Sequence, residues 1–174
     1  MSFKKIDIKN FEINPVTAFA DKWMLLTAGN EEAFNTMTVS WGHLGALWGM
    51  KKGWGLPTAV VYVRPQRYTK QFMDKEGYFT LSMFDESHRS DLAYLGMYSG
   101  KDVDKVKATG ISPVFSENGV YFEEANTVFV CRKLYQASIV EEGFVDKTLL
   151  QENYPNKDYH EVYIGEIVDI LVKE

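Results

Sequence analysis

The chain has 174 residues, of which 45% are hydrophobic and 25% charged, and these proportions indicate one globular domain rather than a disordered segment. The net charge of −5 argues against a nucleic-acid partner, and no apolar run approaches the roughly 20 residues that a membrane-spanning helix needs. No signal peptide is visible, and Cys131, the one cysteine, cannot form an internal disulfide, so we expect a cytoplasmic protein that contacts no membrane.

Apolar runs rich in β-branched residues recur along the chain and predict six strands. In chain order the strands cover residues 23–28, 36–41, 58–63, 77–84, 128–140 and 162–172. In the last strand Val162, Ile164, Val168 and Ile170 follow a period of two, which is typical of one apolar face. Short helices are predicted between the strands, at 69–75, 87–95, 103–108 and 146–150, with Ser87 and Asp102 as N-terminal caps of the second and third.

Glycines and prolines are spread along the chain instead of gathering at one boundary, which indicates a single domain over residues 1–174. Strands and helices do not alternate regularly, as they would in a doubly wound parallel sheet. We therefore predict a mainly β fold with short helices, an antiparallel barrel with helical insertions. Closure of a barrel also removes exposed strand edges.

The segment 35–41 is the first candidate for a binding site. Its residues are Asn35, Thr36, Met37, Thr38, Val39, Ser40 and Trp41. Alternation along a strand places Thr36, Thr38 and Ser40 on one face, where hydroxyls and nearby amides could hold a phosphate or the polar edge of a ring. An edge strand whose Thr and Ser side chains face solvent has the same pattern, and the residues alone leave both interpretations open.

The segment 64–69 carries groups that suit an anion, at the point where a buried strand ends and a short helix begins. Arg64 and Arg67 supply guanidinium groups, Thr69 supplies a hydroxyl, and the helix start supplies free N–H groups. Together these groups match a phosphate. The alternative is a surface ion pair.

The segment 98–105 is the third candidate. Ser99 and Gly100 form a turn that a ligand can approach closely, and the helix that follows could face an anion or a ring carbonyl. A capped helix on the surface, with its lysines in solvent, explains the same residues.

Several other kinds of site are not supported. His43, His88 and His160 are far apart and lack the spacing of a metal-binding helix, so no metal site is predicted. No Gly-rich dinucleotide fingerprint follows a strand, and no signature of a Ser or Cys nucleophile occurs.

Taken in this order and spacing, the segments resemble the flavin reductase-like, FMN-binding split-barrel family, and particularly its flavoredoxin-like branch. The matching stretches are 35–41, 64–69, 77–82, 99–105 and 160–167. The resemblance runs from about residue 12 to the C-terminus. No single motif is specific, but their ordered combination is.

The resemblance implies a six-stranded antiparallel Greek-key split barrel that forms a homodimer, with FMN near the subunit interface. Residues 36–41 would line the ring and ribityl chain, and Arg64 and Thr69 with help from Arg67 would hold the phosphate. Ser99, Gly100 and Lys105 would form the loop that borders the flavin. The candidate cofactor-binding residues are therefore Asn35, Thr36, Met37, Thr38, Val39, Ser40, Trp41, Arg64, Arg67, Tyr68, Thr69, Ser99, Gly100 and Lys105.

His160 is the candidate catalytic residue, because it matches a histidine that in related reductases lies near the flavin face where a nicotinamide could approach. A structural histidine, hydrogen-bonded within the barrel, fits the same position. The segment 48–55 departs from the family pattern by placing two tryptophans in a glycine-flanked loop. We interpret this loop as a flap over the ring or as part of the dimer seam.

The implied function is an oxidoreductase of flavin reductase type, which passes electrons from NAD(P)H through FMN to a small-molecule, metal or protein acceptor. The flavin carries the redox chemistry, so the protein need supply only binding, orientation and electrostatics. The alternative is a non-enzymatic flavin-binding electron carrier, or a split barrel that binds another flat cofactor such as haem.

Overall fold

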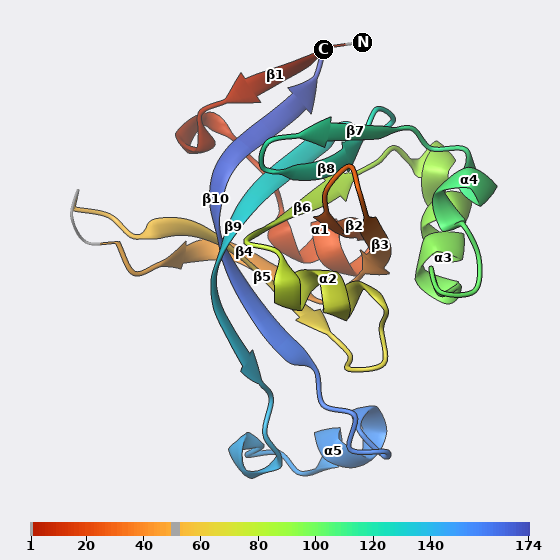
Figure 1. Cartoon of the computed structure of the whole chain (residues 1–174). Coiled ribbons are helices and arrows are strands. Elements are labelled where there is room, and N and C mark those ends of the chain that lie inside the picture. Colours follow the sequence, from red (N-terminus) through yellow and green to blue (C-terminus); the bar gives the residue numbers. More distant parts are fainter. Residues whose placement is uncertain (1, 50–52) are drawn as a thin grey trace.

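The computed structural model describes residues 2–49 and 53–174, which form one large antiparallel sheet, one small sheet and short helices (Figure 1). The strands are β1 (Phe3–Ile6), β2 (Met24–Gly29), β3 (Phe34–Val39), β4 (Gly42–Leu47), β5 (Leu56–Val63), β6 (Tyr78–Met83), β7 (Pro113–Ser116), β8 (Gly119–Phe122), β9 (Thr127–Ser138) and β10 (Glu161–Lys173). The helices are α1 (Pro15–Ala20), α2 (Thr69–Lys75), α3 (Arg89–Met97), α4 (Lys105–Thr109) and α5 (Thr148–Asn153), with 3-10 turns η1 (Ile8–Asn10), η3 (Glu86–His88) and η4 (Glu141–Gly143). The prediction of a mainly β, antiparallel fold with short helices is confirmed.

The large sheet curls into a split barrel. Its strands follow the order β3-β2-β6-β9-β10-β5-β4, and β1 adds to β10. The two end strands, β3 and β4, are joined only by Ser40 and Trp41, which brings the ends of the sheet back together. Within the described residues no ladder of hydrogen bonds connects β3 to β4. The barrel is therefore split beside Ser40 and Trp41.

The prediction of six strands was wrong in number, because the large sheet has eight and a separate hairpin pairs β7 with β8. The additional strands of the large sheet are β1 and β4. Strand β4 contains Gly42 and Gly45, which weaken a strand pattern, yet it pairs with β5 along its whole length. A Cβ at Gly42 would lie 2.3 Å from the ring of Phe19, so glycine lets helix α1 pack closely on this strand.

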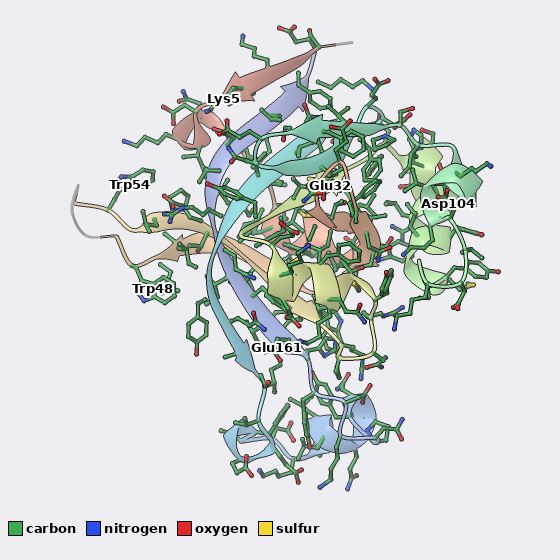
Figure 2. The ribbon with its side chains drawn as sticks, in the orientation of Figure 1. Lys5, Glu32, Trp48, Trp54, Asp104 and Glu161 are labelled. Atoms are coloured by element: carbon green, nitrogen blue, oxygen red, sulfur yellow. The ribbon has the colours of Figure 1, made fainter. Side chains whose placement is uncertain are left out.

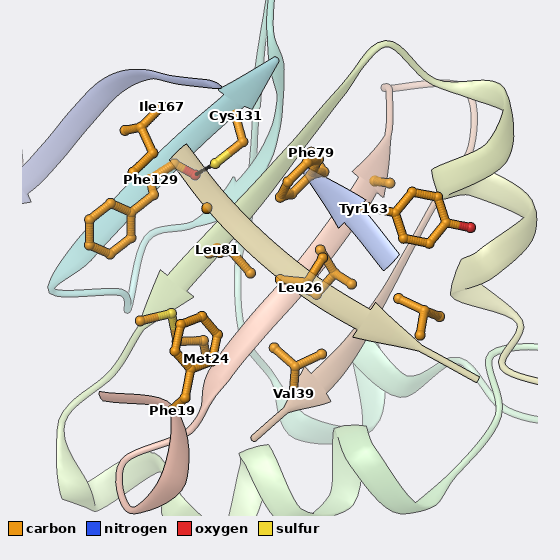
Figure 3. Packing of buried hydrophobic residues seen from close by; sticks show 14 of the residues in the cluster. Phe19, Met24, Leu26, Val39, Phe79, Leu81, Phe129, Cys131, Tyr163 and Ile167 are labelled. Atoms are coloured by element: carbon orange, nitrogen blue, oxygen red, sulfur yellow. Dashed lines mark hydrogen bonds between the residues drawn. The ribbon is translucent and has the colours of Figure 1, made fainter. Parts of the chain in front are cut away.

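Much of the sheet is buried on both faces. Strand β2 is buried at every position, with Leu25 on one face and Met24 and Leu26 on the other. Figure 3 shows the barrel interior, where Leu26 and Cys131 lie among large apolar side chains. The outer face is covered by α3 and β8 through Leu92, Leu95 and Phe122.

Two segments project from the barrel. Strands β9 and β10 continue beyond it, and the residues between them, 139–160, form an arm that carries η4 and α5 (Figure 1). The β4–β5 hairpin projects on another side. Residues 50–52, in the middle of the predicted 48–55 loop, lie outside the described residues.

The predicted caps of two helices were wrong. Helix α3 begins at Arg89, because Ser87 belongs to η3. Helix α4 is capped by Asp104, whose carboxylate accepts from the Lys107 N–H at 3.1 Å, whereas the Asp102 N–H donates to the Ser99 carbonyl in the preceding turn. No helix within the described residues has both the length and the apolar character needed to cross a membrane.

Candidate functional site

All fifteen residues selected from the sequence line three adjoining cavities. The first cavity, of about 150 Å³, is lined by Met37, Thr38, Val39, Ser40, Trp41, Tyr62, Arg64, Arg67 and His160. The second, of about 140 Å³, is lined by Asn35, Met37, Gln66, Arg67, Tyr68, Thr69, Leu95, Met97, Tyr98, Ser99, Gly100 and Lys105. The third, of about 370 Å³, is lined by Phe34, Asn35, Thr36, Gly100, Lys101, Asp102, Val103, Asp104, Lys105 and Val106.

The three cavities adjoin one another because they share lining residues. Met37 and Arg67 line both the first and the second, and Gly100 and Lys105 line both the second and the third. Strand β3 runs beside all three. The structure therefore brings together segments that are separated along the sequence by as many as about 125 residues.

Aromatic rings form the walls of the first cavity. The rings of Trp41 and His160 lie 4.8 Å apart between centroids, tilted by 38°, and Tyr62 meets His160 edge-on at 6.5 Å. Tyr62 was not among the residues selected from the sequence. The signal was its place near the end of β5, two residues before Arg64, because alternation along extended chain puts residues two apart on one face.

His160 is buried beside the first cavity and is hydrogen-bonded within the protein. Its Nδ1 lies 2.8 Å from the Tyr154 hydroxyl. Burial, together with the nearby positive charge of Arg64, lowers the pKa of His160 to about 4. The imidazole is therefore neutral near pH 7. His160 is thus hydrogen-bonded within the protein, as in the structural interpretation of this residue, and its ring also lies on the wall of the first cavity.

Arg64 is tied to the arm. Its guanidinium donates to the Asp158 carboxylate at 2.5 Å and to the Asn153 carbonyl at 2.9 Å. Asp158 also accepts from the Gln66 side chain at 2.9 Å. The sequence placed Arg64 and Thr69 together on one phosphate, but the structure places Arg64 in the first cavity and Thr69 in the second. Arg67 is the arginine that reaches both.

Lys105 is the buried cation of the second cavity, with a relative exposure of 5%. Its ammonium donates to the carbonyls of Thr36, at 2.5 Å, and Leu95, at 2.9 Å. No carboxylate within the described residues lies within 4.0 Å of it. Burial, with repulsion from Arg67, lowers the pKa of Lys105 to about 8, so the side chain is still charged near pH 7.

Neutral donors surround this cation. The Asn35 amide donates to the Thr69 hydroxyl at 2.7 Å, which links strand β3 to the start of α2. Gly100 packs against the same amide, because a Cβ there would lie 2.1 Å from the Asn35 side-chain oxygen. A larger residue at this position would require the Asn35 side chain to move.

The hydroxyl groups on and just after strand β3 differ in their hydrogen-bond partners and in their exposure. Thr36 bonds to the Thr27 hydroxyl at 2.9 Å and to the Leu26 carbonyl, and Thr38 donates to the Leu92 carbonyl at 2.5 Å. These two hydroxyls thus hold β3 to β2 and α3. Ser40, which follows the strand, is exposed beside the first cavity.

The tryptophans of the 48–55 loop lie on the projecting β4–β5 hairpin (Figure 2). Trp48 contacts Tyr135 with 6.3 Å between ring centroids, and the Lys9 ammonium lies 4.7 Å from the Trp54 ring. Neither tryptophan lines the three cavities. Within one chain the described part of the loop is therefore no flap over the site.

A family model described as a flavin reductase like domain matches residues 16–174. Solved structures share the fold at low sequence identity. An FMN-binding domain of a flavin reductases-like enzyme from Shewanella baltica has a TM-score of 0.68 and 11% identity, over 98% of this chain and 77% of that chain. Flavoredoxin from Methanosarcina acetivorans has a TM-score of 0.65 and 20% identity, over 98% of this chain and 76% of that chain. An NADH:FAD oxidoreductase from Streptomyces globisporus has a TM-score of 0.62 and 14% identity, over 87% of this chain and 75% of that chain. A comparison with curated proteins gave no match.

Proposed function

The chain belongs to the flavin reductase-like domain family, and on this premise we propose that it binds FMN across the three cavities and works as an oxidoreductase of flavin reductase type. The observation that carries the proposal is the buried ammonium of Lys105, which has carbonyl partners but no carboxylate within the described residues. A buried cation is costly unless an anion joins it. The phosphate of FMN is an anion that would complete this arrangement.

The phosphate end of the site is the second cavity. Lys105 and Arg67 supply positive charge, and Thr69, Asn35 and Ser99 supply neutral hydrogen-bonding groups beside them. Arg64 is less suited to this task, because Asp158 already pairs with its guanidinium. We therefore assign the phosphate to Lys105 and Arg67 in place of Arg64.

The ring end is the first cavity. Trp41, Tyr62 and His160 give it flat walls, which suit a planar ring system. Bound FMN would supply the hydride and electron chemistry, which no side chain of the site provides. The side chains would hold the ring, exclude water from one side of it and fix its orientation.

His160 acts here as a neutral group. Because its pKa lies near 4, it does not deliver a proton near pH 7, and its Nδ1 is already engaged by Tyr154. We assign it the role of a wall and orienting group beside the ring. Its selection as a catalytic residue remains a prediction.

The proposed electron donor is NAD(P)H. Support comes from the Streptomyces globisporus neighbour, which is described as an NADH:FAD oxidoreductase. The final acceptor is proposed to be a small molecule, a metal complex or a protein, as expected when the flavin performs the transfer.

Two measurements test the proposal. First, FMN is titrated into the protein while flavin fluorescence and the melting temperature are followed; saturable quenching with a rise in melting temperature is expected. Second, NADH and NADPH are added in turn to the FMN-loaded protein without oxygen, and loss of the visible flavin absorbance is followed. Rapid bleaching, with many turnovers once free flavin is supplied, supports the proposal. Absence of saturable FMN binding overturns it.

The second candidate function is a flavin-binding electron carrier, which the fold shared with flavoredoxin favours. A carrier predicts slow or no bleaching by either nicotinamide but prompt bleaching by dithionite. A split barrel that binds haem would instead show a Soret band after addition of haem and no response to FMN. The two titrations, together with the additions of dithionite and of haem, therefore separate all three functions.

We also propose that the chain forms a homodimer. Exposed apolar side chains gather on the two projections, where a monomer would leave them in water. On the β4–β5 hairpin they are Leu47, Trp48 and Trp54, and on the arm Val140, Val145 and Leu149. The dimer-seam interpretation of the 48–55 loop follows from this proposal.

A further inference from the structure

A fourth cavity shares lining residues with the first cavity of the proposed FMN site. It has a volume of about 380 Å³ and is formed by helix α1, the start of β4 and the arm. Ser40, Trp41 and Tyr62 line both this cavity and the first one. A molecule in the fourth cavity would therefore touch side chains that also touch the proposed flavin ring.

The lining of the fourth cavity differs in chemistry from the other three. It contains no Lys, Arg, Asp or Glu, whereas each of the others has at least one. Its walls are mostly apolar, with Phe19 and Tyr154 buried at the base and Val16 exposed at the rim. An uncharged ligand is favoured, because a charge moved here would lose its water without gaining a partner.

One polar feature could orient such a ligand. The Tyr62 hydroxyl and the His43 Nδ1 lie 3.4 Å apart, which is a long contact that a better-placed hydroxyl could replace. Burial raises the pKa of Tyr62, so its hydroxyl keeps its proton at neutral pH. The volume falls within the roughly 300–1,000 Å³ of small-molecule sites.

We propose that the fourth cavity binds a small, flat, uncharged aromatic molecule with one hydroxyl or carbonyl, in a site that shares Trp41 and Tyr62 with the first cavity. Binding itself is independent of the proposed function. Only the use of this molecule as an electron donor or acceptor rests on it.

The test uses 2-naphthol as the probe and the full chain, once without flavin and once with saturating FMN. Calorimetric titration should give saturable binding, and 2-naphthoate, the charged relative, should bind at least tenfold more weakly.

Ala20→Phe fills the cavity from an exposed position of α1 and should weaken 2-naphthol binding at least tenfold. Val16→Trp, at the 71%-exposed rim of the cavity, is a second variant that should weaken 2-naphthol binding and have little effect on the core. Ala108→Phe, at an exposed position of α4 that lines none of the four cavities, is the matched control and should leave binding unchanged.

Three results would overturn the inference. The first is 2-naphthol binding that FMN abolishes, because the probe would then occupy the flavin cavity. The second is equal affinity in wild type, Ala20→Phe and Val16→Trp. The third is the absence of saturable 2-naphthol binding; if Val16→Trp also converts a dimer to a monomer, this face is an interface between copies of the chain. A protein that binds 2-naphthol as expected but fails to bind FMN would refute the proposed function alone.

Discussion

Lys105 shows how a single residue can indicate a ligand. A lysine with 5% exposure that contacts only carbonyl oxygens keeps its charge at a cost, and the pKa of about 8 reflects that cost. Arg67 adds repulsion from the same cavity. Two cations are held together here without a counter-charge among the described residues. An anionic ligand would offset both their mutual repulsion and the cost of burying the charge of Lys105.

Replacing Lys105 with Met should weaken FMN roughly 10- to 100-fold, the loss expected for one charge-assisted hydrogen bond to a buried group. Riboflavin has no phosphate, so its affinity should change little. Lys107→Met removes an exposed lysine from the same helix and is the control. Dissociation constants for both flavins give the answer, and equal losses for both would contradict the assignment of the phosphate.

The same residue predicts how binding depends on pH. The ammonium is the form that binds phosphate, and its pKa in the ligand-free protein is about 8. FMN affinity should therefore hold near pH 7 and decline as the pH rises through 8, while riboflavin affinity stays level. In Lys105→Met this decline should disappear.

His160 predicts a loss of stability in acid. Its pKa is about 6.5 when unfolded and about 4 when folded, so between these values the unfolded chain binds more protons and the free energy of unfolding falls as the pH falls. The slope from this residue reaches at most about 1.4 kcal/mol per pH unit. Urea unfolding of His160→Gln between pH 7 and 4 should show a shallower acid decline than wild type or His88→Gln. An unchanged slope would show that His160 does not titrate in this way.

At the scale of elements, the contact between the turn after α3 and strand β3 shapes the second cavity. Gly100 touches Asn35, and Asn35 in turn orients the Thr69 hydroxyl at the start of α2. Three elements are thus fixed relative to one another by one glycine and one amide.

Gly100→Ala should disturb this arrangement, because its Cβ would require Asn35 to move. We expect FMN affinity to fall at least fivefold through the displaced Asn35–Thr69 pair. Gly77→Ala adds a methyl group where nothing lies within 4 Å and should leave affinity unchanged. Titration of both variants with FMN tests the contact, and a Gly100→Ala protein of wild-type affinity would refute it.

The strands that the sequence predicted are those with dense apolar or β-branched runs, and β4 was missed because its glycines hide such a run. The period-two pattern of the last strand indicated a strand correctly but not its buried side. Before the register shift that follows Ile167, Tyr163 and Ile167 fill the core while Val162 and Ile164 are half-buried; after it the buried side changes and Ile170 enters the core. Alternation alone does not reveal such bulges.

At the scale of the whole molecule, the site forms where the barrel is split and segments distant in sequence meet. Its lining could be selected from short motifs, because each motif contributes several lining residues within a few positions of the chain. The ion pair between Arg64 and Asp158 spans 94 residues, and no local pattern announces it. For that reason the sequence assigned Arg64 to phosphate, while the structure ties it to the arm.

The proposed dimer makes a prediction for the projecting hairpin. Trp48 is 49% exposed, and Trp48→Ser should raise the dissociation constant of a dimer that buries it. Phe115→Ser, which removes a 41%-exposed aromatic from β7, should not. Sedimentation velocity over a range of concentrations measures both variants. A wild-type chain that sediments as a monomer throughout would end the proposal.

Cys131 gives the molecule an internal reporter of its own opening. Its thiol is fully buried in the barrel interior, and burial raises its pKa far above the normal range, so an alkylating reagent cannot react with it in the closed barrel. Because the sequence contains no other cysteine, each alkylated chain records one excursion in which the barrel came apart. A ligand that binds only the closed barrel should therefore slow this labelling.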